Sequence, residues 1–309
     1  MEKKSSLYCS PFRYPGGKAC IFPFVSKLFY ENHLIGSNYA EPYAGGGGLA
    51  LKLLFDEFVN KIYINDFDRA IYSVWKQITE NSTRFCDWLS DVEVNVETWK
   101  YYKEIQSSNA KVDDFDLAKA TYFLNRTNIS GVIKGGMIGG YNQSGKYKIN
   151  ARFNRDDLIN RIERIARFRN RINISNQDGL GFIRRMDKRN EQIFIYLDPP
   201  YLQKGADLYM NYYTKKDHEK LSKNVHKMDK KWMVSYDNHD FILNLYGERR
   251  KLIYKLSQAA SNRIGDEILI FSDQLNFSDS LKKLNSPSQV INYNSYRNET
   301  INFTEKALD

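Results

Sequence analysis

The sequence predicts an α/β fold: a mainly parallel sheet with helices on both faces, interrupted by a mostly helical insert. Short apolar runs rich in Ile, Val and Tyr recur along the chain, helical patterns separate several of them, and their composition is typical of strands buried on both faces. Between about residues 81 and 170 these runs vanish, and a polar, helical and glycine-rich region replaces them. We therefore expect a discontinuous domain formed by residues 1–80 and 171–309, with an inserted domain at 81–170.

The predicted strands share a short apolar core, and several end on an acid. They are KIYIND (61–66), INIS (172–175), IFIYLD (193–198), KWMVSYD (231–237), KLIYKL (251–256) and EILIFS (267–272). Apolar residues at helical spacing predict helices between or before them. The two clearest sets are Ile21, Phe24, Val25 and Leu28, and Ile71, Val74, Trp75 and Ile78.

Composition limits the class of protein. The 309 residues are 42% apolar and 14% aromatic, which is enough for a substantial core. Three cysteines without a CxxC spacing, and four histidines without ligand spacing, favour neither a disulfide framework nor a metal site. Because the chain has no long apolar run and its first ten residues, MEKKSSLYCS, lack the apolar core of a signal peptide, we expect a cytoplasmic protein without a membrane span.

The positive charge is concentrated in one segment. The formal net charge is +9, and the stretch from Arg126 to Arg171 holds eleven basic residues against three acids. A solvated helix face explains part of this, because Leu158, Ile162 and Ile165 are spaced as the apolar side of an arginine-rich helix. The glycine-rich, basic loop before that helix is not explained in this way, and it suits a polyanionic partner such as nucleic acid.

A glycine loop and an acid predict a nucleotide-type cofactor site. In EPYAGGGGLALKLL (41–54), Gly45 and Gly47 fit the spacing of a strand, a tight turn and a helix that approach a ligand closely. Asp66, about 20 residues further on at the end of the next strand, is where a ribose acceptor belongs. Alternatively, the glycines form only a flexible turn and Asp66, with Asp68, caps the following helix. The chain has no phosphate-binding GxxxxGK[ST] motif, so we do not expect a triphosphate hydrolase.

The motif FRYPGGK (12–18) is a second candidate ligand site. Its Pro-Gly-Gly turn would bring the Tyr14 ring and the Lys18 ammonium together, a pair that suits a ligand with an aromatic base and a carboxylate. Taken alone, the motif is equally typical of an ordinary turn.

The sequence YLDPPY (196–201) ends an apolar strand with hydrogen-bond acceptors. The Asp198 carboxylate and the Pro199 carbonyl can accept both N–H bonds of an exocyclic amine on a nucleobase, and Tyr201 offers a stacking face. Holding both N–H groups out of plane localises the nitrogen lone pair, so the amine can attack an electrophile. The alternative is a strand-terminating turn in which Asp198 caps the next element.

Together these motifs resemble the Dam-type family (D12 class, alpha group) of S-adenosylmethionine-dependent DNA adenine N6-methyltransferases. The motifs FRYPGGK, EPYAGGGG, INDFD and LDPPY occur in the family order, and FLNRTNISG, YYTKKDHEKLS and AASNRIGDEILIFS extend the resemblance over nearly the whole chain. The resemblance implies a Rossmann-like catalytic domain, a target-recognition insert, and transfer of a methyl group to an adenine flipped out of duplex DNA. One departure is Tyr14, where the family often has Trp.

The resemblance also implies roles for individual residues. The residues expected around S-adenosyl-L-methionine are Tyr14, Lys18, Glu41, Gly45, Gly47, Asp66, Asp178 and Asp198. The residues expected to hold the target base are Asp198, Pro199, Pro200 and Tyr201. The residues of the insert expected to contact DNA are Arg126, Asn128, Lys134, Lys146, Arg152, Arg161 and Arg164.

Other functions remain open at this stage. A cytosine N4-methyltransferase would use the same pocket chemistry, although Asp at position 198 favours adenine by resemblance. A DNA-binding regulator with an idle cofactor fold and an NAD-dependent dehydrogenase are further alternatives; the second leaves DPPY and the basic insert unexplained. We expect the chain to act on double-stranded DNA and to be a monomer or weak dimer. Whether it has a cognate restriction nuclease as a second partner stays open at this point. The target sequence cannot be inferred.

Overall fold

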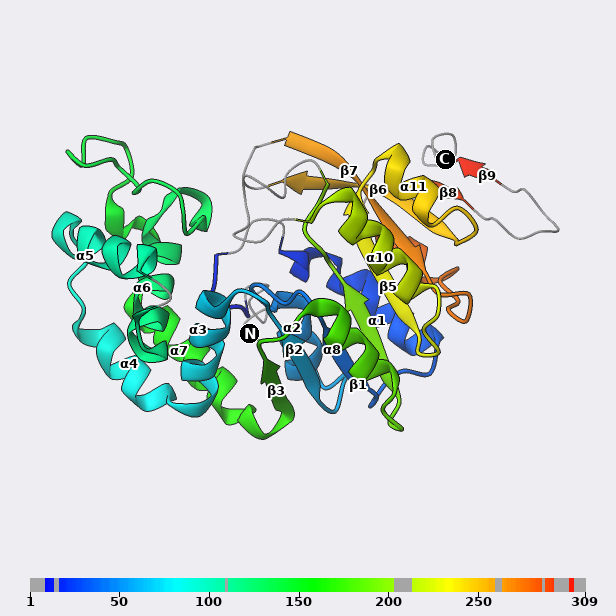
Figure 1. Ribbon diagram of the computed structural model, residues 1–309, viewed down its shortest axis with the longest axis horizontal. Coiled ribbons are helices and arrows are strands. Elements are labelled where there is room, and N and C mark those ends of the chain that lie inside the picture. The colour runs from blue at the N-terminus through cyan, green and yellow to red at the C-terminus, as the bar shows by residue number, and fades with distance from the viewer. Residues whose placement is uncertain are drawn as a thin grey trace, which may run out of the picture.

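A computed structural model describes residues 9–13, 17–108, 111–202, 213–258, 263–284, 287–291 and 300–302. Its centre is a nine-stranded sheet with the order β3-β2-β1-β4-β5-β7-β6-β8-β9 (Figure 1). The strands are β1 (Asn38–Glu41), β2 (Ile62–Asn65), β3 (Ile172–Ser175), β4 (Ile193–Leu197), β5 (Trp232–Asp237), β6 (Lys251–Gln258), β7 (Arg263–Phe271), β8 (Pro287–Ile291) and β9 (Thr300–Asn302).

From β1 to β6 the α-helices alternate with the strands, except that α3 to α7 all lie between β2 and β3; within the described residues no α-helix separates β6, β7, β8 and β9. They are α1 (Phe22–Glu31), α2 (Gly48–Phe55), α3 (Arg69–Glu80), α4 (Ser82–Asp91), α5 (Val96–Ser107), α6 (Asp114–Thr127), α7 (Arg155–Arg167), α8 (Gly179–Asp187), α10 (Lys215–Val225) and α11 (Asp240–Leu245). The two apolar sets at helical spacing lie on α1 and α3, apart from Ile21, which precedes α1.

The direction of the strands confirms the predicted mainly parallel sheet. Strands β3, β2, β1, β4 and β5 pair in parallel with their neighbours. Both β5 and β6 are antiparallel to β7, so β6 runs in the same direction as the parallel strands. The sequence order of the strands runs one way from β1 to β3 and the other way from β4 to β5, so β1 and β4 flank the point where the order changes direction. The carboxyl ends of these two parallel strands lie at one edge, where ligands bind in open α/β sheets.

Helices cover both faces of the sheet, as predicted. Along β4 the side chains of Phe194 and Tyr196 enter one apolar core, and those of Ile193, Ile195 and Leu197 enter the other. The first core includes residues of α1, α2 and α3, and the second includes residues of α8, α10 and α11. Every side chain of β4 is buried, which explains why this strand reads as a continuous apolar run.

The helices α4 to α7 gather at one end of the molecule, away from the sheet (Figure 1). Helix α3 joins the two parts, because it packs against β3 and also against α6 and α7. On α7 the buried residues are Leu158, Ile162 and Ile165, as the helical spacing predicts. No helix in the described ranges is long and apolar enough to cross a membrane.

Candidate active site

Asp198 lies where β4 ends, and two side chains hold its carboxylate. Ser235 of β5 donates from Oγ to Oδ1 of Asp198 at 2.6 Å, and Lys18 donates from Nζ to Oδ2 at 3.0 Å. Pro199 is buried and Pro200 is half-buried. Since each carboxylate oxygen has a second lone pair, Asp198 can still accept a hydrogen bond from a ligand.

The Lys18 ammonium is buried in this cluster and has more than one acidic neighbour. Its Nζ lies 3.8 Å from Oε2 of Glu267, and 5.0 Å from the centre of the Tyr201 ring. Glu267 also accepts a hydrogen bond of 2.9 Å from the Tyr254 hydroxyl. Burial raises the pKa of Glu267, while the Lys18 ammonium opposes that shift. Lys18 therefore links the end of β4 to a buried acid on β7.

Glu267, Tyr254 and Ser235 are site residues that the sequence did not reveal. Glu267 is opposite Asp237 of β5 in the antiparallel β5–β7 pair, so the middle of β7 lies at the carboxyl edge of the parallel strands. The only signal in the sequence was the family-like segment around EILIFS. Ser235 belongs to a predicted strand, and Tyr254 to another, but neither residue type points to a site without the register.

The glycine loop contacts Asp66 directly. The backbone N–H of Gly45 donates to Oδ2 of Asp66 at 2.9 Å, and the N–H of Asp68 donates to Oδ1 at 2.9 Å. Burial, together with the Asp68 carboxylate, raises the pKa of Asp66 to about 7. Asp68 accepts a hydrogen bond from the N–H of Ala70 and so caps α3, which confirms the capping alternative for Asp68 alone.

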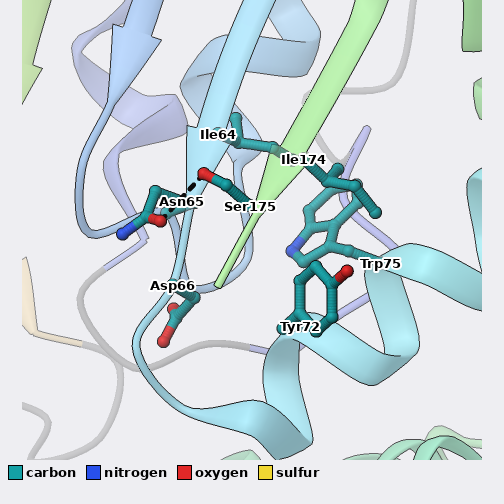
Figure 2. Close-up of a pocket in the computed structure, with 8 residues that line it drawn as sticks. Ile64, Asn65, Asp66, Tyr72, Trp75, Ile174 and Ser175 are labelled. Carbon is teal, nitrogen blue, oxygen red and sulfur yellow. Dashed lines mark hydrogen bonds between the residues drawn. The ribbon is translucent and has the colours of Figure 1, made fainter. Parts of the chain in front are cut away.

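Asp66 is one of the residues that line a small pocket at the carboxyl ends of β2 and β3 (Figure 2). The pocket is lined by Ala44, Ile64, Asn65, Asp66, Tyr72, Trp75, Ile174 and Ser175. Its wall is aromatic on one side, and Asn65 accepts a hydrogen bond of 2.8 Å from the Ser175 hydroxyl on the other.

Two further predicted cofactor residues already have partners in the structure. Glu41, at the end of β1, is buried and accepts a hydrogen bond of 2.7 Å from the Tyr39 hydroxyl. Burial raises the pKa of Glu41 to about 8. Asp178 is exposed, and its carboxylate caps α8 by accepting from the N–H of Gly181 at 3.0 Å. Tyr14 lies outside the described residues.

The predicted DNA-contact residues fall into three groups: exposed, buried and half-buried. Lys134, Lys146 and Arg152 are exposed, in the region between α6 and α7. Arg126 and Asn128, in contrast, are buried, and their side chains bond within the protein. Arg126 donates to the carbonyl of Arg152, and Asn128 accepts from the Trp99 indole N–H and donates to two carbonyl groups. We therefore withdraw Arg126 and Asn128 from the DNA-contact set, because neither side chain reaches solvent.

Arg161 and Arg164 of α7 are half-buried. Arg161 pairs with Asp157, with 2.7 Å between Nη2 and Oδ2, and Arg164 lies 4.2 Å from the centre of the Phe55 ring.

Within the part of the chain that the structure describes, no group of three or more His, Cys, Asp or Glu side chains could hold a metal ion.

Fold and site together define an α/β protein with a glycine loop and two acids, Asp66 and Asp198, at the carboxyl edge of its parallel strands. The family model of D12 class N6 adenine-specific DNA methyltransferases matches residues 14–261. The chain belongs to this family and is an adenine-specific DNA methyltransferase, a class of enzyme that requires a methyl donor.

Three curated relatives are type II methyltransferases. M1.LlaDCHI of Lactococcus lactis subsp. cremoris is 25% identical over 207 residues, which cover 65% of this chain and 68% of the relative. M.CviBI of Paramecium bursaria Chlorella virus NC1A is 27% identical over 239 residues, covering 75% and 86%. M.MjaIII of Methanocaldococcus jannaschii is 27% identical over 260 residues, covering 76% and 87%. The similarity therefore extends over most of the chain.

Proposed function

We propose that the methyl donor is S-adenosyl-L-methionine and that it binds between the glycine loop and the Asp66 pocket. Two features support the proposal: the half-buried Asp66 carboxylate lies at the strand ends, where a ribose acceptor belongs, and the half-buried Tyr72 ring beside it offers an aromatic face for a nucleobase. Glu41 and the Gly45–Gly48 loop would hold the methionine part, and Asp178 would lie near the adenine. When bound, this cofactor supplies an electrophilic methyl group on a sulfonium.

We infer that Asp198 and Pro199 hold the exocyclic amine of the target adenine. Ser235 and Lys18 fix both oxygens of the Asp198 carboxylate, so its remaining lone pairs have a defined direction. Two accepted hydrogen bonds would turn the amine out of conjugation and direct its lone pair toward the methyl group. Tyr201 would stack on the ring, and Pro200 would keep the motif extended. This is the observation that carries the mechanism: the carboxylate is oriented before any base arrives.

The substrate is proposed to be duplex DNA from which the adenine is flipped out, because the amine is inaccessible inside the helix. Residues 81–170 would form the target-recognition domain. The exposed cations Lys134, Lys146 and Arg152 would contact phosphates, and Tyr141 and Tyr147 are exposed beside them. The type II names of the relatives suggest a cognate restriction nuclease as partner; a monomer or weak dimer stays a prediction.

The proposed function is tested by modification-aware sequencing of plasmid DNA from a methylation-deficient host that expresses the chain. N6-methyladenine in one short motif, lost in Asp198→Ala and kept in the control Asp279→Ala, is the expected result. Asp279 is an exposed carboxylate, so the control removes the same group elsewhere. A mark on cytosine, or the same adenine mark in Asp198→Ala, would contradict the proposal.

A further inference from the structure

A short amino-terminal segment connects the helical insert to the glycine loop. We define residues 9–13 as the N-terminal strap. Helices α6 and α7 hold its backbone through side chains that are more than one hundred positions away in the sequence. Arg161 donates from Nη1 to the carbonyl of Ser10 at 2.9 Å, and Asn125 accepts from the N–H of Arg13 and donates to its carbonyl, each at 2.8 Å.

The other side of the strap contacts the glycine loop. The Ser10 hydroxyl donates to the carbonyl of Gly46 at 2.5 Å. The Phe12 ring packs against Trp75, with 5.8 Å between ring centres, and the Trp75 indole N–H donates to the carbonyl of Gly45 at 2.9 Å. Two consecutive carbonyl groups of the loop are thus tied to the strap, one directly and one through Trp75.

The packing leaves the strap little freedom to move independently of the insert. Asn125 is 1% exposed and Phe12 is 5% exposed. A Cβ atom added to Gly131, which follows α6, would lie 2.2 Å from the carbonyl oxygen of Arg13. If Asn125 released the strap, its buried Oδ1 would lose the hydrogen bond from Arg13, while its Nδ2 would keep only the bond of 2.9 Å to the carbonyl of Gly131. A shift of α6 or α7 is therefore transmitted to the strap.

We propose that the strap couples the insert to the glycine loop, which makes Asn125 and Arg161 positioning residues for methyl transfer. They act on the Gly45–Gly46 loop through Ser10 and Phe12, so binding of duplex DNA to the insert and binding of cofactor to the loop strengthen each other. This inference rests on the proposed function, because it takes DNA as the ligand of the insert and an S-adenosyl compound as the ligand of the loop. Coupling of this kind is reciprocal.

The test measures the affinity for S-adenosylhomocysteine by calorimetry, with and without a duplex that contains the motif found by sequencing. In the wild type the affinity for S-adenosylhomocysteine should be about fivefold or more higher with the duplex than without it. The ratio of these two affinities should fall below about twofold in Asn125→Ala, Arg161→Gln and Ser10→Ala. Ser10→Ala removes only the hydroxyl that bonds the strap to the carbonyl of Gly46. This variant therefore tests the coupling even if Asn125→Ala does not fold.

Matched controls separate coupling from loss of stability or charge. Thr121 lies on α6, as Asn125 does, and Thr121→Ala removes its buried hydrogen bond to Gln106. Arg167 lies on α7, as Arg161 does, and Arg167→Gln removes an exposed charge. Both controls should keep the wild-type ratio. Full coupling in the strap variants would overturn the inference, as would a wild-type ratio near one. If the wild type binds no S-adenosylhomocysteine at all, the proposed function itself fails.

Discussion

Asp66 is the residue whose ionisation should be visible in cofactor binding. The ionised Asp66 carboxylate can accept ribose hydroxyl hydrogens at both oxygens, whereas protonation turns one oxygen into a donor, and the pKa of about 7 places that change near neutrality. The ionised fraction rises from about one tenth at pH 6 to about nine tenths at pH 8. Affinity for S-adenosylmethionine should therefore be about tenfold higher at pH 8. Calorimetry at both pH values checks this, and in Asp66→Asn the dependence should disappear.

Lys18 is the residue whose loss should cost the most stability at the site. Its ammonium is buried between Asp198 and Glu267, so Lys18→Met leaves two acids without their cation. We expect the free energy of unfolding to fall by about 3 kcal/mol. Urea denaturation measures this, with Lys61→Met as a control at an exposed lysine. Equal losses in the two variants would show that the buried ion pair is not stabilising.

At the scale of elements, the turn between β1 and α2 depends on Gly47. Its φ is +55°, and an added Cβ would lie 2.8 Å from the Trp75 ring. Gly47→Ala should destabilise the protein by about 1–3 kcal/mol and weaken cofactor binding as the loop moves. Gly36→Ala is the matched control, since its φ is +79° but no atom lies within 4 Å of the added Cβ. It should lose stability only. Unchanged cofactor affinity in Gly47→Ala would contradict the role of the loop.

The sequence predicted elements well where a strong local pattern exists. IFIYLD contains β4, because a parallel strand buried on both faces is a continuous apolar run. The segment INIS coincides with β3, an edge strand in which only Ile172 is buried and apolar residues alternate with polar ones. Strands β8 and β9 were not predicted, because PSQVI and TIN are short and mostly polar and depend on pairing with β6 and with each other. A local sequence pattern carries no information about pairing between strands that are far apart in the chain.

The sequence indicated which motifs would lie at the edge of the sheet, but not the residues whose position depends on packing; the roles of the motif residues stay predictions. DPPY, the glycine loop and Asp66 meet at one edge because parallel strands align their carboxyl ends. Glu267 was missed because its place depends on the antiparallel register of β7. Arg126 and Asn128 were assigned to DNA because they lie in the basic insert that the resemblance implies, and sequence does not reveal that packing at the end of α6 buries them.

At the scale of the whole molecule, the basic surface of the insert should determine the salt dependence of DNA binding. Replacing the exposed Lys134, Lys146 and Arg152 by Gln should reduce the slope of log K against log salt by about 0.9 for each DNA phosphate that the variant no longer neutralises. A control replaces three exposed lysines outside the insert, Lys61, Lys188 and Lys282. Fluorescence anisotropy over a range of salt concentrations gives both slopes. The same slope in both triple variants would contradict the placement of DNA on the insert.

The central claim is that this fold moves a methyl group from S-adenosylmethionine to the amine held by Asp198. The most direct measurement supplies the purified chain with duplex DNA and S-adenosylmethionine that carries a trideuterated methyl group, followed by mass spectrometry of the nucleosides. The account predicts that the label is found in N6-methyladenine and that Asp198→Ala transfers none. Label in N4-methylcytosine, or equal transfer by Asp198→Ala, would contradict it.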